Sequence, residues 1–97
     1  MKANITNLKK ALEACANAHN AEYSDWSDEG QLGVWSVTPG TICDVRMILT
    51  AFFGDDYAAD VDENIGCITI WLDESMDGKN DVDETTLALA LPYGTKL

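Results

Sequence analysis

The residues best able to do chemistry in this chain are the carboxylates of one acidic segment, residues 55–84. This segment holds eleven of the 17 Asp and Glu residues and a single base, Lys79, so it carries a net charge of −10 out of −11 for the whole chain. Carboxylates gathered in this way can pair with the Lys and Arg side chains of a partner, or supply oxygen ligands to a divalent cation. A surface selected only for solubility would intersperse bases among these acids.

The first part of this segment has the apolar spacing of a helix. An apolar side chain at every fourth position predicts a short amphipathic helix over 55–64, capped by Asp55. On such a helix Asp56, Asp60 and Glu63 fall at i, i+4 and i+7, so neighbouring carboxylates lie about 5–6 Å apart.

The second part of the segment offers carboxylates at strand spacing. Asp81 and Asp83 are two residues apart, which is about 6.6 Å along an extended chain. Consecutive phosphates of a nucleic acid have a similar spacing, and a duplex carries one charge per about 1.7 Å of its axis. We therefore expect a phosphate-like array that binds the basic groove of a nucleic-acid-binding protein or complex. The predicted partner-binding residues are Asp55, Asp56, Asp60, Asp62, Glu63, Asp73, Glu74, Asp77, Asp81, Asp83 and Glu84.

A calcium site is an alternative use of the same carboxylates. Residues 73–84 match the twelve-residue EF-hand loop, with glycine at its sixth position, Gly78. The eighth position, which is apolar in paired EF-hands, is Asn80, and the flanking residues have the pattern of strands rather than helices. The Ca²⁺ ligands on this alternative would be Asp73, Ser75, Asp77, Asp81 and Glu84.

The three tryptophans have different expected positions. Trp35 and Trp71 fall in predicted strands, where we expect them in the core. Trp26 lies between acidic residues and could be a core residue or an exposed anchor for an arginine-rich partner.

No arrangement typical of an active site is present. His19 is the only histidine, and the chain lacks a nucleophile elbow, a phosphate-binding glycine loop and a zinc-protease motif. The odd set Cys15, Cys43 and Cys67 fits neither a disulfide framework nor a zinc site, and each is expected to be a small buried residue. We therefore expect a protein that is not an enzyme and needs no cofactor.

The elements of the first half follow from hydrophobic periodicity. Apolar residues at helical spacing predict a helix over 5–19, capped by Thr6 or Asn4. A polar run over 22–30 indicates a loop, and 31–38 reads as a strand that ends in a Pro-Gly turn. Residues 41–50 alternate as a strand and contain several β-branched residues, although a helix ending at the glycine at position 54 also fits.

The elements of the second half complete the expected topology. Residues 65–72 and 83–91 read as strands, joined by a hairpin tip at 76–80. The fold class expected from these elements is α+β: a four-stranded antiparallel sheet with an N-terminal helix and a short second helix, in the order αββαββ.

Length and composition limit the class of protein further. The 97 residues fit a single domain, 1–97, and the apolar content of 46% is enough to form a core. The strong negative charge excludes direct binding to nucleic acid or to anionic membranes, because both depend on cationic side chains. No apolar run is long enough for a signal peptide or a membrane span, so a cytoplasmic protein is expected.

In length, acidity and lack of catalytic residues, the chain resembles the small DNA-mimicking inhibitors encoded by phages. It is most similar in character to the type I anti-CRISPR proteins, although no motif is shared. This resemblance implies a non-catalytic inhibitor that acts in the host cytoplasm and blocks target-DNA binding by a crRNA-guided surveillance complex. A phage structural or assembly protein with an acidic surface is the remaining alternative.

Overall fold

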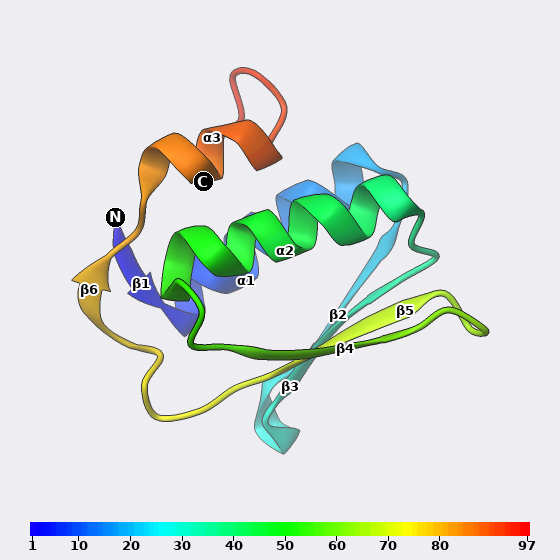
Figure 1. Ribbon diagram of the computed structural model, residues 1–97, viewed down its shortest axis with the longest axis horizontal. Helices are drawn as coiled ribbons and strands as arrows, with labels where there is room; N and C mark the ends of the chain where they lie inside the picture. The colour runs from blue at the N-terminus through cyan, green and yellow to red at the C-terminus, as the bar shows by residue number, and fades with distance from the viewer.

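Two helices lie against one face of a four-stranded antiparallel sheet in the computed structural model, which describes all 97 residues (Figure 1). The strand order is β2-β3-β5-β4, and β1 and β6 form a separate two-stranded sheet. None of the helices combines the length and apolar character needed to cross a membrane. The elements in chain order are β1 (Lys2–Asn4), α1 (Ile5–Ala18), β2 (Glu22–Trp26), the 3-10 turn η1 (Ser27–Glu29), β3 (Gln31–Trp35), α2 (Pro39–Phe53), β4 (Ala58–Asp62), β5 (Cys67–Trp71), β6 (Asp77–Asp81) and α3 (Glu84–Ala90).

The α+β class and the four-stranded antiparallel sheet are confirmed, whereas the order αββαββ is wrong. A third helix and a second small sheet were not expected.

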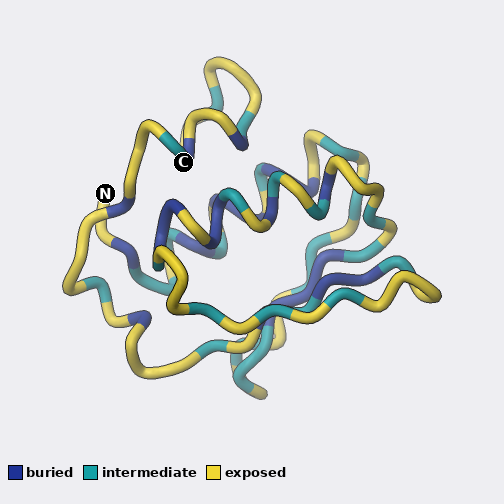
Figure 2. Tube along the Cα trace, in the orientation of Figure 1, coloured by how far each residue is buried: buried dark blue, intermediate teal, exposed yellow.

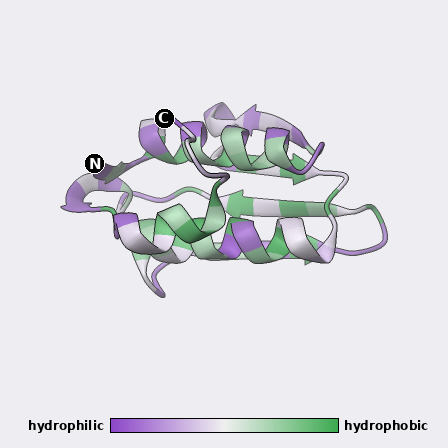
Figure 3. Ribbon diagram, turned by 90° about the horizontal axis from the view of Figure 1, so that it is seen from above, coloured by the Kyte–Doolittle hydropathy of each residue, from purple (hydrophilic) through white to green (hydrophobic).

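The core lies between the sheet and helices α1 and α2. The central strands contribute Leu32, Val34, Ile68 and Ile70, which have no exposed surface. Buried residues lie along the two helices and along the central strands (Figure 2). Along each helix, hydrophobic and hydrophilic residues alternate from turn to turn (Figure 3). This alternation places one apolar stripe of each helix on the sheet.

The predicted N-terminal helix is confirmed as α1. Asn4 is its N-cap, and the Asn4 side chain accepts a hydrogen bond of 2.8 Å from the backbone N–H of Asn7. The cap satisfies a backbone donor that has no partner within the helix.

The strand expected over 41–50 is wrong, and these residues belong to α2. The helix begins with a capping box in which Thr38 and Thr41 bond each other's backbone N–H groups, followed by Pro39 at the first helical position. Both features favour a helix start. Val45, Ile48 and Leu49 are fully buried, which is a helical rather than an alternating pattern.

The two edge strands of the four-stranded sheet, β2 and β4, lie where a loop and a helix were expected. The loop expected over 22–30 contains β2, which pairs along its whole length with β3. The helix expected over 55–64 is wrong: residues 58–62 form β4, paired with β5, and only Ala59 and Val61 turn toward the core. The four-residue repeat of apolar residues is accidental here, since alternation along β4 decides which side chains are buried.

The C-terminal region also differs from expectation. The expected hairpin tip at 76–80 is mostly strand, because β6 pairs with β1 rather than turning back on β5. The strand expected over 83–91 is the helix α3, which Asp83 caps by accepting from the backbone N–H of Thr86. Leu87 and Ala90, three residues apart, are its buried side chains.

Candidate functional site

The predicted partner-binding carboxylates separate into two groups on the fold. We name the first the acidic edge, because it follows β4, an edge strand of the sheet, and the loops at both ends of β4: Asp55, Asp56, Asp60, Asp62 and Glu63. We name the second the acidic end, because it surrounds β6 and the start of α3: Asp73, Glu74, Asp77, Asp81, Asp83 and Glu84. β4 and β6 can be followed in Figure 1.

Strand geometry replaces the helical spacing expected along the acidic edge. Asp60 and Asp62 are two residues apart on β4 and pair with Thr69 and Cys67 of β5, so both side chains lie on the sheet face opposite the helices. Their spacing is about 6.6 Å at the usual rise of a strand. The phosphate-like interval that the sequence suggested at positions 81 and 83 is therefore found at 60 and 62.

The two groups meet at one end of the molecule. Asp56, Asp81 and Asp83 line a groove of about 420 Å³ beside the C-terminal end of α2. At the other end of β4, Glu63 lines a hollow of about 210 Å³ with Thr38 and Pro39, which start α2. The acidic edge thus extends from one end of α2 to the other.

Most carboxylates of the acidic end already have partners within the chain. Asp73 accepts hydrogen bonds from the backbone N–H and the hydroxyl of Ser75. Asp77 accepts from the backbone N–H of Lys79 at 3.0 Å, and this bond is the main cause that lowers the pKa of Asp77. Asp83 accepts from the side chain and backbone of Thr86, which lower its pKa.

Two further acids of the acidic end form ion pairs with the first two residues of the chain. Lys2 Nζ lies 3.2 Å from Asp81 Oδ1, and the N-terminal ammonium lies 3.8 Å from Glu84. On the acidic edge, only Asp62 is engaged, since it accepts from the backbone N–H of Asn64. The carboxylates of the two groups that make neither an ion pair nor a hydrogen bond are Asp55, Asp56, Asp60, Glu63 and Glu74.

The ligands expected for a calcium loop at 73–84 do not converge. Residues 77–81 are an extended strand, and no three His, Cys, Asp or Glu side chains of the molecule are grouped as a metal site. Asp81 and Glu84 face the N-terminal residues instead. This extended strand differs from the EF-hand, in which the loop curls around the ion.

Of the two tryptophans expected in the core, Trp71 is exposed and Trp35 is only partly buried. Trp26 is 39% exposed, which fits the exposed anchor rather than a core residue, whereas Trp71, expected in the core, is 41% exposed. Trp35 is only partly buried and packs edge-to-face against Trp26, with ring centroids 5.7 Å apart. Alternation in Cys67–Trp71 could have revealed this, since Ile68 and Ile70 face the core and Trp71 is out of phase with them.

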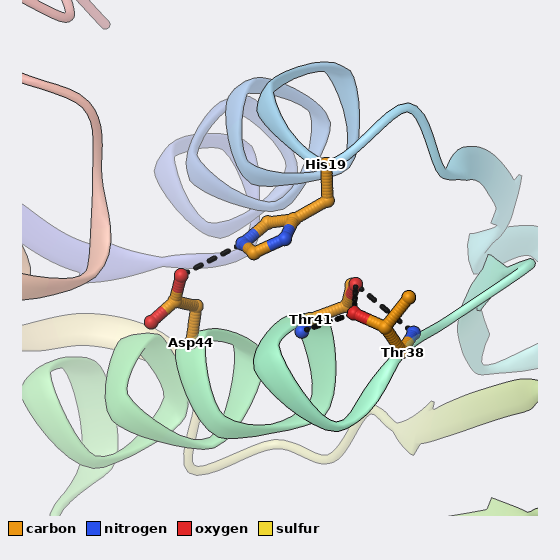
Figure 4. A network of polar contacts seen from close by, with 4 residues as sticks. All are labelled: His19, Thr38, Thr41 and Asp44. Atoms are coloured by element: carbon orange, nitrogen blue, oxygen red, sulfur yellow. Dashed lines mark hydrogen bonds and ion pairs between the residues drawn. The ribbon is translucent and has the colours of Figure 1, made fainter.

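His19 serves as a link between the two long helices. It follows the last residue of α1, and its Nε2 donates to Asp44 Oδ2 of α2 at 2.7 Å, close to the threonines that start α2 (Figure 4). The sequence shows His19 only as the lone histidine, and no local pattern indicates Asp44, 25 residues away, as its partner.

The cysteines are free thiols in two environments. Cys15 and Cys67 are buried as expected, but Cys43 is exposed on α2. Burial, followed by the charge of Asp44, raises the pKa of Cys15 to about 11, so this thiol is protonated at neutral pH.

No family model, curated protein or solved structure matches the chain.

Proposed function

We propose that the protein is a non-catalytic inhibitor that occupies the basic, nucleic-acid-binding groove of a partner and presents carboxylates in place of phosphates. The observation that carries this proposal is the acidic edge, where Asp55, Asp56, Asp60 and Glu63 are all exposed and none has a cation within 4.0 Å. Uncompensated like charges along one edge destabilise the folded state. A cationic partner relieves this repulsion on binding.

The binding energy on this proposal is distributed over many weak contacts. An exposed ion pair contributes about 0.2–1 kcal/mol, so affinity requires several pairs together with an apolar anchor. Association is expected to be fast at low ionic strength and to slow with added salt. The resemblance to type I anti-CRISPR proteins suggests a crRNA-guided surveillance complex as the first target to test.

The experiment uses the protein immobilised on beads and a bacterial lysate fraction enriched for basic proteins on heparin. A captured partner is expected to be displaced by duplex DNA and by NaCl. The triple variant D56N/D60N/E63Q should weaken capture roughly tenfold, because it removes three exposed pairs.

The matched control removes three exposed carboxylates from elsewhere in the molecule. Glu13, Asp28 and Glu29 lie on α1 and η1 and make no ion pair. The variant E13Q/D28N/E29Q has the same net charge as D56N/D60N/E63Q and should retain capture. An equal loss of capture in both variants would show that net charge alone, and not the acidic edge, determines binding. If neither DNA nor salt displaces the captured partner, the result would instead favour the alternative that this chain is a structural or assembly protein with an acidic surface.

A further inference from the structure

The face of the four-stranded sheet opposite α1 and α2 carries no helix (Figure 1). Strand pairing assigns the side chains to the two faces, because residues directly opposite each other in neighbouring strands share a face. Leu32 pairs with Ile70 and Val34 with Ile68 on the covered face. The residues between them therefore point to the uncovered face, which we call the open face.

All three tryptophans of the chain lie on the open face. Trp26 pairs with Gln31, and Gln31 pairs with Trp71, so one row across the sheet holds two tryptophans with Gln31 between them. Two strand spacings separate Trp26 from Trp71, which is about 9.5 Å. Trp35 lies on the same face of β3.

Two of the rings stabilise each other. Trp26 and Trp35 meet at an interplanar angle of 79° above Gly33, where an added Cβ would lie 3.3 Å from Trp35 Nε1. The absence of a side chain at Gly33 is what allows the rings to approach. Trp71 has no aromatic neighbour, and its partners in the row are Gln31 and the small Ala58. Packing within the chain gives no reason for a large exposed aromatic side chain at Trp71.

Carboxylates border the aromatic row. Asp60 is diagonal to Trp71 on the open face, and Asp62 follows it along β4. Glu22, opposite Trp35, carries a further carboxylate on the other edge strand. The open face therefore combines exposed indole rings with negative charge on both edges.

This combination selects the chemistry of the occupant. A guanidinium group stacks on an indole ring and also forms a two-pronged pair with a carboxylate, whereas an ammonium group is more strongly hydrated and does neither as well. A second copy of the chain is disfavoured, since it would bring a second net charge of −11 against the first.

We propose that the open face binds arginine side chains of the partner protein, with the Trp71 ring and the Asp60 carboxylate contacting the same guanidinium group. This inference rests on the proposed function and identifies both the anchor and the partner chemistry. The apolar contact supplies the anchor that scattered ion pairs lack.

The test compares nona-arginine with nona-lysine as peptide probes, each titrated into the protein. The wild type should bind nona-arginine about 2- to 5-fold more tightly for each guanidinium stacked on a ring. NMR should show the Trp71 indole N–H resonance moving with nona-arginine. The variant W71A should lose most of this preference, and W71F should retain part of it.

Tyr93 provides the matched control, because it is a fully exposed aromatic residue beyond α3, away from the open face. Y93A should keep the wild-type preference. The inference is overturned if W71A keeps the same arginine preference, or if neither peptide binds.

The two proposals fail separately. If D56N/D60N/E63Q weakens both peptides while W71A changes nothing, the acidic edge binds cations but the open face is not the anchor. If W71A abolishes the arginine preference while D55N/D56N/E63Q, which keeps Asp60, captures the partner as the wild type does, the open face stands and the DNA-mimic proposal falls.

Discussion

Asp25 shows how a single carboxylate of this acidic chain can be stabilised. It lies in β2, where Ser27 donates to it through side chain and backbone and Lys9 Nζ approaches Oδ2 to 3.1 Å. These contacts lower the pKa of Asp25 to about 2. Lys9 also donates to the hydroxyl of Ser27 at 2.9 Å, which joins α1 to the start of η1.

The lowered pKa of Asp25 predicts a pH-dependent contribution to stability. The unfolded chain has an Asp pKa of about 3.9, so the stabilisation is complete above that pH and is lost as the pH falls toward 2. The free-energy difference between wild type and D25N should therefore narrow from about pH 4 to pH 2, as measured by urea unfolding. A difference that stays constant over this range would mean that Asp25 is not stabilised as a charge.

At the scale of elements, α2 depends on its first turn. Thr38 accepts from the backbone N–H of Thr41, and the Thr41 hydroxyl accepts from the backbone N–H of Thr38 while itself being fully buried. The variant T38A removes one half of this capping box, and T38S retains it.

The expected cost of T38A is about 1 kcal/mol, the usual value for losing an N-cap. For a domain of this size it corresponds to a decrease in melting temperature of about 4–8 °C. Calorimetry on T38A and T38S gives the measurement. A T38A melting temperature equal to that of the wild type would show that Pro39 alone fixes the start of α2.

The elements that the sequence predicts well are those whose apolar residues fit only one period, helical or alternating. The N-terminal helix, β3 and β5 have unmixed periodicity, and Gly54 ends α2 as the helical alternative expected. Residues 41–50 fit both periods, and Thr38 and Pro39, which favour the helix, lie before that window. β4 and β6 depend on pairing with β5 and β1, which local patterns do not contain.

The candidate site also has one part that local sequence indicates and another part that depends on strand pairing. Composition alone identified the acidic segment, but only the pairing of β4 with β5 places Asp60 and Asp62 on the open face. The tryptophan row needs the register of β2, β3 and β5 together.

For the whole molecule, the main consequence of the charge is self-repulsion. The screening length decreases from about 10 Å at 0.1 M salt to about 3 Å at 1 M, so NaCl should raise the melting temperature. D56N/D60N/E63Q should show a smaller rise, because the repulsion along the acidic edge is already reduced. A wild-type melting temperature that is flat or falls with NaCl would mean that the charges compensate each other.

Displacement of DNA from a captured partner tests the central claim most directly. Labelled duplex DNA bound to that partner is titrated with wild type, D56N/D60N/E63Q or E13Q/D28N/E29Q, and fluorescence anisotropy reports the bound DNA. We expect wild type and E13Q/D28N/E29Q to release the DNA alike, and D56N/D60N/E63Q to require roughly ten times more protein. DNA that stays bound at saturating wild-type protein, or equal release by the two variants, would contradict the account.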